Sequence, residues 1–336
     1  MPRTGRLHIP GGCYHVMGRG LERRRIFNQA DDKNDFLERL GNILAQTDGQ
    51  CLAWAIMSNH YHLLMRVGAQ PLSKLMSPLL GGYASSYNRR HRRSGYVFQN
   101  RYKSILFDAD SYLLELVRTI HLNPIKAEIL KSLSQLDRYH WTGHAGLLGI
   151  HSQSWQAIEP VLGLFGKRIA TARQRYRKFM AEGIKTKIAP ELSGGGLIRS
   201  YGGWEAIQAL RQDHIVRVGD ERILGDSDFV EQALKADALQ LKEKTAIQRA
   251  GWDIKTLIQR VCAYCEIAPN QLKQKGRSNN LSLAKALICY WGTEHIGATT
   301  NELADRLGMS QPAASQSSKR GREYCREQSI EMEGIC

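Results

Sequence analysis

Apolar and polar positions along the chain separate an N-terminal part, residues 1–145, from a helical remainder. In the first part, three apolar runs of strand length are interleaved with three segments in which apolar residues recur at helical spacing. This order predicts an α+β fold in which a small antiparallel sheet carries helices on one face. The predicted strands cover residues 13–17, 53–65 and 104–107, and the predicted helices cover residues 31–46, 72–90 and 110–120.

Helical patterns dominate the rest of the chain. Residues 146–249 read as an α-helical connector, and residues 250–336 as an all-α domain. In the latter, Thr300 can cap a helix that Gly308 ends, and a polar helix begins near Gln311. Helix, tight turn and polar helix form the helix-turn-helix pattern of proteins that bind duplex DNA, although a structural helical hairpin has the same pattern.

The longest apolar run carries His60 and His62, two positions apart. Side chains alternate between the two faces of a strand, so both imidazoles point to the same side of the predicted sheet. Two neutral imidazoles held in this way are good ligands for one divalent metal, although two partly exposed histidines on a sheet face are the simpler interpretation. Further on, Pro124 disfavours helix at Asn123, whose amide would complete a metal site with open positions for a phosphate.

The net charge indicates that the protein binds a polyanion. The formal net charge is +15, and residues 1–140 hold 20 lysines and arginines against 11 aspartates and glutamates. Residues 89–93 form a basic run, and the segment 95–103 places aromatic residues beside cations. This mixture is typical of proteins that stack the bases and neutralise the backbone of single-stranded nucleic acid. A solvated basic surface above an aromatic core gives the same sequence pattern.

The cysteines and the lack of long apolar runs bear on the cellular compartment. Seven cysteines are scattered along the sequence, and the close pair Cys262 and Cys265 has no second cysteine or histidine pair at zinc spacing. Buried, reduced thiols are therefore expected. Because no apolar run has membrane-spanning length and no charged-then-apolar leader precedes a cleavage site, we expect a cytoplasmic protein with no membrane partner.

Four blocks of sequence resemble the REP-associated branch of the single-tyrosine HUH transposases. Their order and spacing match over residues 1–145, which is more specific than any one motif. The resemblance implies that His60, His62 and, as third ligand, Asn123 bind Mg²⁺ or Mn²⁺, and that a tyrosine on the following helix attacks a DNA phosphodiester. The blocks are Asn59-His60-Tyr61-His62-Leu63-Leu64, Tyr87-Asn88-Arg89-Arg90-His91, Gly95-Tyr96-Val97-Phe98-Gln99-Asn100-Arg101-Tyr102-Lys103 and His121-Leu122-Asn123-Pro124.

The resemblance places the nucleophile four residues before Asn123, where this chain has Thr119. A tyrosine suits the reaction because its phenolate, with a reference pKa of about 10, attacks phosphorus and can leave again. A threonine hydroxyl is a much poorer leaving group and needs a dedicated base. Tyr112, Tyr87 and Tyr83 are alternative nucleophiles, although packing or DNA contact is the simpler role of each. The metal ligands are thus present and the expected nucleophile is replaced.

A looser resemblance covers residues 254–325, which are similar to the DNA-binding domain of the bacterial replication initiator. It rests on Lys275, Arg277 and the segment 281–285, whereas residues 311–315 depart from the initiator's usual residues. The resemblance implies that this part of the chain binds duplex DNA.

Together these features predict a bacterial, nucleoid-associated transposase-like protein that binds single-stranded or hairpin DNA through its N-terminal domain and duplex DNA through its C-terminal domain. Members of the family are often homodimers. An active protein would be a metal-dependent single-strand DNA endonuclease and strand transferase; the alternative is a non-catalytic DNA-binding regulator derived from a transposase. A hydrolase of small phosphoesters fits the basic surface less well. The predicted DNA contacts are Arg23, Arg24, Arg25, Arg89, Arg90, Arg92, Arg93, Arg101, Tyr102, Lys103, Lys275, Arg277, Gln311, Ser315, Gln316, Lys319 and Arg320.

Overall fold

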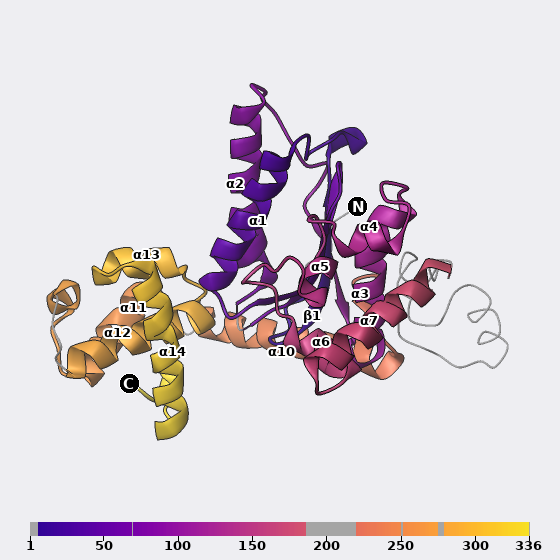
Figure 1. Cartoon of the computed structure of the whole chain (residues 1–336). Helices are drawn as coiled ribbons and strands as arrows, with labels where there is room; N and C mark the ends of the chain where they lie inside the picture. The colour runs from indigo at the N-terminus through magenta and orange to yellow at the C-terminus, as the bar shows by residue number, and fades with distance from the viewer. Residues whose placement is uncertain (1–5, 69, 186–219, 250, 275–278, 336) are drawn as a thin grey trace. The chain divides into compact units, whose positions relative to one another are not determined.

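The computed structural model divides the chain into two compact units, Met1–Lys235 and Ala236–Cys336 (Figure 1). This division differs from the expected one, because the stretch that the sequence marks as a connector belongs largely to the first unit. The described residues are 6–68, 70–185, 220–249, 251–274 and 279–335.

A five-stranded sheet forms the centre of the first unit, in the order β2-β3-β1-β4-β5. The first four strands in this order pair antiparallel, as predicted, whereas the two-residue β5 is parallel to its neighbour β4. The expected small antiparallel sheet therefore gains a short parallel edge from a distant part of the chain. The strands are β1 (Cys13–Arg19), β2 (Gln50–Ile56), β3 (His60–Arg66), β4 (Lys103–Phe107) and β5 (Ile223–Leu224).

The longest apolar run is a hairpin and not the single strand that was predicted. Its two arms are β2 and β3, and the backbone N–H of Met57 donates to the carbonyl of His60 across the turn, at 2.9 Å. Ser58 and Asn59 occupy the two central positions of the turn. Both residue types favour turns, so this dipeptide was the available signal inside an otherwise apolar run. The hairpin places Asn59 and His60 at the tip of the sheet.

Helices cover both faces of the sheet (Figure 1). On one face, α1 (Ala30–Ala45) and α2 (Leu72–Arg90) pack against Tyr61, Leu63 and Met65 of β3. On the other face, α3 (Ala109–Lys126) and α7 (Ile169–Lys185) pack in a second core that includes Leu64. The predicted α+β architecture is confirmed, but the expectation of helices on one face only was wrong. Six of the seven residues of β2 are buried, which fits a strand covered on both sides.

Helix α3 continues through Pro124 to Lys126, beyond the predicted range of 110–120 and although Pro124 disfavours helix at Asn123. Pro124 has no backbone N–H to donate to the carbonyl of Ile120, four residues earlier. The side-chain amide of Asn123 donates to that carbonyl at 3.3 Å and to the carbonyl of Thr119 at 3.1 Å. The asparagine thus supplies the donor that the proline lacks, and the helix is preserved.

Short helices complete the first unit, and α10 runs across the boundary between the units. In the described part of the chain, no helix is long and apolar enough to cross a membrane. These elements are η1 (Leu21–Arg23), α4 (Leu133–Asp137), α5 (His144–Leu148), α6 (Glu159–Leu162), η2 (Gly163–Phe165) and α10 (Ser227–Arg249).

The second unit is a helical domain with its own hydrophobic core. Thr299 caps α13, because its side-chain oxygen accepts the backbone N–H of Glu302 at 3.1 Å. The predicted cap Thr300 is therefore the first residue of the helix. Gly308 follows α13 with a φ of +61°, a left-handed conformation that glycine adopts without strain. The helices are α11 (Ile254–Tyr264), η4 (Pro269–Lys273), α12 (Asn279–Trp291), η5 (Gly292–Ile296), α13 (Thr300–Leu307), α14 (Gln311–Gln328) and η6 (Met332–Gly334).

The cysteines that the structure describes as free are all buried, as expected from their spacing. Burial raises the pKa of Cys265 to about 11 and that of Cys289 to about 12. These thiols therefore stay protonated near neutral pH and behave as small apolar side chains.

Candidate functional site

An open cavity of about 580 Å³ lies at one end of the sheet, where β1 and β3 meet the segment that leads into β4. Its wall combines two histidines, four cations and several amides. A cavity of this composition can accept an anionic ligand and, through the imidazoles, a metal ion. The lining residues are Met17, Gly18, Arg19, Arg23, Asn59, His60, Tyr61, His62, Gln99, Asn100, Arg101 and Lys103.

The strand register places His60 and His62 on the same face as two cations. Directly opposite residues in an antiparallel pair share a face. Met17 lies opposite both His62 and Lys103, and Arg19 lies opposite His60. Tyr61, between the histidines, packs in the core on the other face. The imidazoles therefore point to the side of the sheet that α3 covers.

The two imidazole rings are adjacent and each has one nitrogen engaged. Their centroids are 5.2 Å apart with the planes nearly perpendicular. Nδ1 of His60 lies 2.7 Å from Oδ1 of Asn59, and Nδ1 of His62 lies 3.0 Å from Nε2 of His15. Burial lowers the pKa of His60, and burial together with the neighbouring His15 and His60 holds the pKa of His62 well below its ordinary value. Neutral imidazoles with Nε2 left for a ligand are the form that binds metals.

Asn123 and Thr119 are both half-buried on α3, which packs on the same sheet face as the histidine pair. The two amide hydrogen bonds of Asn123 use its nitrogen, so Oδ1 is the atom left for a metal or a substrate. Neither residue belongs to the set that lines the cavity. The structure thus brings His60 and His62 together and places Asn123 on a helix of the same sheet face, one turn from Thr119.

This donor set can hold a divalent cation. Two neutral imidazoles and an amide oxygen are metal ligands, and substrate oxygens or water can fill the remaining positions. Within the described ranges, no group of three or more histidine, cysteine, aspartate or glutamate residues could hold a metal. A metal at this site would therefore depend on the histidine pair, with uncharged oxygens as its other protein ligands.

Two of the alternative tyrosines lie on the opposite face of the sheet. Tyr83 and Tyr87 pack in the core formed with α1 and α2, and their hydroxyls donate to the backbone carbonyls of Ile26 and Arg25, respectively. The structure does not bring either one together with the histidine pair. Tyr112 lies on α3, two turns before Thr119, and packs half-buried against the second core.

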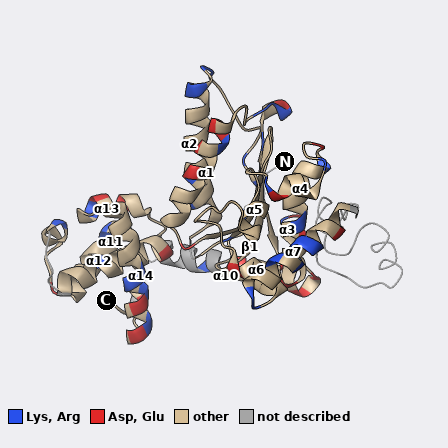
Figure 2. Cartoon of the chain, viewed as in Figure 1, with Lys and Arg blue, Asp and Glu red and all other residues tan. Residues whose placement is uncertain are grey.

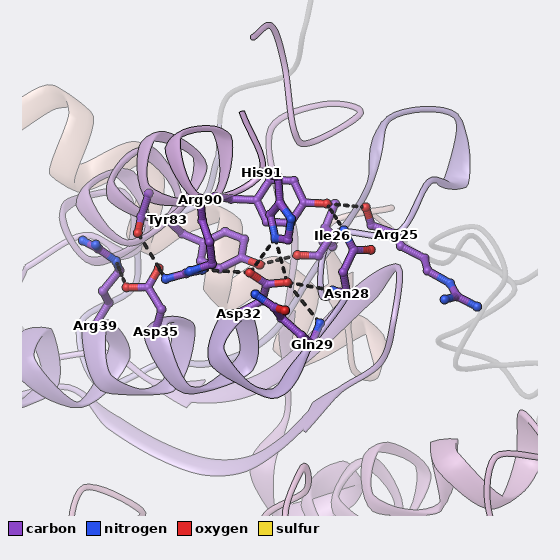
Figure 3. A network of polar contacts seen from close by, with 12 residues as sticks. Arg25, Ile26, Asn28, Gln29, Asp32, Asp35, Arg39, Tyr83, Arg90 and His91 are labelled. Carbon is purple, nitrogen blue, oxygen red and sulfur yellow. Dashed lines mark hydrogen bonds and ion pairs between the residues drawn. The ribbon is translucent and has the colours of Figure 1, made fainter. Parts of the chain in front are cut away.

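A buried carboxylate organises the residues around these tyrosines (Figure 3). Asp32 is fully buried and accepts hydrogen bonds from His91 and Arg90, each at 2.8 Å, and from the backbone N–H groups of Asn28 and Gln29. Burial alone would raise the pKa of Asp32, but these hydrogen bonds together lower it. Asp32 therefore ties the end of α2 to the segment between η1 and α1.

Hydrogen bonds also hold two basic segments, residues 23–25 and 89–93, near each other. The hydroxyl of Tyr87 donates to the carbonyl of Arg25. Just outside the two segments, the backbone N–H of Leu21 donates to the carbonyl of Val97 at 3.0 Å. In Figure 2 the ribbon is blue, which marks lysine and arginine, at the end of α2 and on the neighbouring loop. Except for Arg90 and Arg93, which are half-buried, the basic residues predicted in these segments are exposed: Arg23, Arg24, Arg25, Arg89 and Arg92.

Two residues predicted to contact DNA have structural partners. Arg90 pairs with the buried Asp32 and, at 3.5 Å, with Asp35. Tyr102 is buried, and the guanidinium of Arg6 lies 3.7 Å from its ring centroid, so this ring is not available for base stacking. Tyr96, by contrast, is 84% exposed. The aromatic surface that the segment 95–103 offers is therefore Tyr96.

In the second unit, the polar face of α14 is exposed at three of the predicted positions, Gln316, Lys319 and Arg320. Gln311 and Ser315 are half-buried. Lys275 and Arg277 lie outside the described residues.

Three residues of the site were not identified from the sequence: His15, Arg19 and Asn59. His15 and Arg19 belong to β1 and share the face of Met17, at positions two residues apart. The period-two pattern of a strand was the available signal, but it becomes informative only once the pairing of β1 with β3 is known. Asn59 belongs to the first of the four sequence blocks, but the sequence assigned it no role beside His60.

Residues 10–120 match the family model of IS200-like transposases. No curated protein is significantly similar to the chain. Among solved structures, the chain is similar to a REP-associated tyrosine transposase bound to a REP hairpin, with 12% sequence identity and a TM-score of 0.37 over 47% of this chain and 98% of that one. The matched family segment contains the histidine pair and Thr119, while Asn123 follows it. Over these residues, about a third of its length, the chain is therefore similar to the IS200-like transposases.

Proposed function

We propose that the first unit binds single-stranded or hairpin DNA in the cavity at the histidine pair, with a divalent cation, and that its Thr119 prevents the strand transfer typical of the family. The observation that carries the proposal is the sheet face on which His60 and His62 lie beside Arg19 and Lys103. Cations next to neutral imidazoles suit a phosphodiester, which brings negative charge and can supply oxygen ligands to the metal.

His60 and His62 would hold the metal through Nε2, with Oδ1 of Asn123 as the third ligand. A bound Mg²⁺ or Mn²⁺ polarises a phosphodiester and offsets the charge that develops on it. Arg19, Arg101 and Lys103 neutralise the flanking phosphates. On this proposal the chain binds the metal and the DNA strand but does not cut and rejoin the strand.

Thr119 decides between the two functions that the sequence leaves open. A phenol at this position would attack the phosphodiester and be displaced again, so that strands are cut and rejoined. A threonine hydroxyl is a much poorer leaving group, and the amide of Asn123, one turn away, cannot act as a base for it. The function best supported is a DNA-binding protein of transposase ancestry, and a metal-dependent strand transferase is the second candidate.

The test is binding of the full-length protein to a labelled single-stranded hairpin, with and without Mn²⁺. We expect Mn²⁺ to strengthen binding in the wild type, and the double substitution His60→Ala and His62→Ala to remove that effect. His151→Ala is the matched control, because His151 is exposed and lies outside the cavity. Hairpin binding that is indifferent to Mn²⁺ in the wild type would contradict the metal site.

We propose in addition that the second unit reads duplex DNA through α14. Support comes from the arrangement of α13, three turn residues and a polar helix whose Gln316 and Lys319 are exposed. Side chains of these types can reach base edges and phosphates in a major groove. The double substitution Gln316→Ala and Lys319→Ala should weaken duplex binding by the full chain, whereas Lys255→Ala, which removes an exposed lysine from α11, should not.

A further inference from the structure

His15 is a buried histidine that neither the sequence pattern nor the family match assigns to the site. It lies on β1 and is 6% exposed. In the register of the sheet it is opposite Leu64 on one side and Ile105 on the other. His62 is diagonal to it on the same face, and Nε2 of His15 lies 3.0 Å from Nδ1 of His62. This contact joins residues 47 positions apart in the sequence.

Only one proton arrangement across this contact is compatible with metal binding by His62. A hydrogen bond between two neutral imidazoles needs one N–H and one lone pair. If His62 accepted at Nδ1, its own proton would sit on Nε2, which could then not bind a metal. If His62 donates from Nδ1, its Nε2 carries a lone pair directed away from His15.

We infer that His15 is a positioning residue for the metal site: its Nε2 accepts the Nδ1–H of His62 and thereby fixes both the tautomer and the ring orientation in which His62 can bind a metal through Nε2. This inference rests on the metal site of the proposed function. Ligand histidines are commonly held in this way by a partner on the other ring nitrogen, and loss of the partner weakens metal binding.

The arrangement at His60 supports the inference. Oδ1 of Asn59 lies 2.7 Å from Nδ1 of His60, so this imidazole is also held at Nδ1 by an acceptor. The two members of the pair thus present Nε2 in the same way, although their partners come from different places. Asn59 is adjacent in the sequence, whereas His15 reaches His62 only through the pairing of β1 with β3.

The apolar surroundings make the bond to His15 effective. Leu64 and Ile105, opposite His15 on the two neighbouring strands, are both buried. A hydrogen bond in such surroundings does not compete with water and orients its partner more strictly than an exposed one. Asn59, at the tip of the hairpin, is half-buried. His15 is therefore the stricter of the two constraints.

The experiment measures the affinity of the full-length protein for Mn²⁺ alone, by calorimetry and by the EPR signal of free Mn²⁺. His15→Leu removes the acceptor and should weaken Mn²⁺ binding about 10- to 100-fold. His15→Gln keeps an acceptor oxygen and should restore affinity to within a few fold of the wild type. Equal affinity of wild type and His15→Leu, or a His15→Gln variant as weak as His15→Leu, would overturn the inference.

Two measurements on the wild type need no substitution at His15. Nitrogen-15 NMR of the metal-free protein should show His62 as the Nδ1–H tautomer, and the Nε2–H tautomer would overturn the inference. Pulsed EPR of bound Mn²⁺ should count two coordinated imidazole nitrogens, and three would make His15 a ligand. If the wild type binds no Mn²⁺, or His60→Ala with His62→Ala binds it unchanged, the metal site itself is wrong, which is a distinguishable result.

Discussion

At the scale of single residues, the candidate site combines two adjacent imidazoles with a threonine where the resemblance to the family implies a nucleophilic tyrosine. His60 and His62 are neutral, adjacent and held at Nδ1, which is the state that a metal requires. Thr119 occupies the position from which a phenol would attack. On the proposed function, this combination would retain DNA binding and remove strand transfer.

Thr119→Tyr should restore a covalent protein–DNA adduct. The new phenol would stand one helical turn from Asn123 on the helix that covers the histidine pair, and a phenolate can both attack phosphorus and leave again. The measurement is a denaturing gel after incubation with labelled hairpin single strands and Mn²⁺. The wild type and Thr119→Phe should give little or no adduct. A wild-type adduct mapped to Tyr112 would instead identify a relocated nucleophile.

At the scale of elements, the buried Asp32 holds α1, α2 and the basic loop in one arrangement. Asp32→Asn removes the charge while keeping the shape, and leaves Arg90 and His91 beside a neutral amide. The loss should be about 3 kcal/mol, at the low end for a broken buried pair, because Arg90 keeps Asp35 as a partner. The measurement is the urea midpoint of unfolding. Asp35→Asn, a half-buried site, should cost less.

The same carboxylate predicts how stability depends on pH. Its pKa is lowered in the folded protein below the ordinary value of 3.8, so its contribution is complete above that value. The contribution is lost as the pH falls through the lowered folded value, where the folded state must take up a proton. The urea midpoint of the wild type should therefore decline more between about pH 5 and about pH 2 than that of Asp32→Asn. Parallel curves would show that Asp32 is not the group responsible.

The loop between α2 and β4 offers one ring for base stacking. Tyr96 is 84% exposed, and the guanidinium of Arg93 donates to its carbonyl at 3.3 Å. Tyr96→Ala should weaken binding to single-stranded DNA by about 1–3 kcal/mol, the usual value of one stacked base. Tyr102→Phe is the matched control, because that ring is buried beneath Arg6 and should not affect DNA affinity. Fluorescence anisotropy with a labelled single strand measures both.

At the scale of the whole molecule, local patterns predicted individual elements and missed how distant parts join. The bounds of α2 and the shared face of the histidine pair follow from spacing within one segment. By contrast, His121 on α3 and His144 both bond to the hydroxyl of Tyr176 on α7, at 2.8 and 2.7 Å. Nothing local to Tyr176 signals this buried contact, so α7 reads as part of a connector although it packs in the first unit.

The site shows the same limit. Period-two alternation predicts that His60 and His62 share a face, because that property belongs to one strand. His15 contacts His62, 47 positions away, and Arg19 lies beside His60, 41 positions away. Both neighbours depend on how β1 is aligned with β3, and the alternation along either strand does not determine that alignment. Sequence reasoning thus predicted that His60 and His62 share a face and missed the residues of β1 that lie beside them.

The two units should bind DNA at separate sites, and competition with the full chain tests this. Protein saturated with a short duplex should still bind a labelled hairpin single strand, and the doubly substituted Gln316→Ala, Lys319→Ala protein should keep hairpin affinity while losing duplex affinity. Each phosphate contact releases counterions, so both affinities should fall as the salt concentration rises. Loss of Lys319 should reduce the slope of log affinity for duplex against log salt concentration by about one unit. The control is Lys255→Ala, with both slopes unchanged. Displacement of the hairpin by the duplex would show a shared site and would remove the assignment of duplex binding to α14.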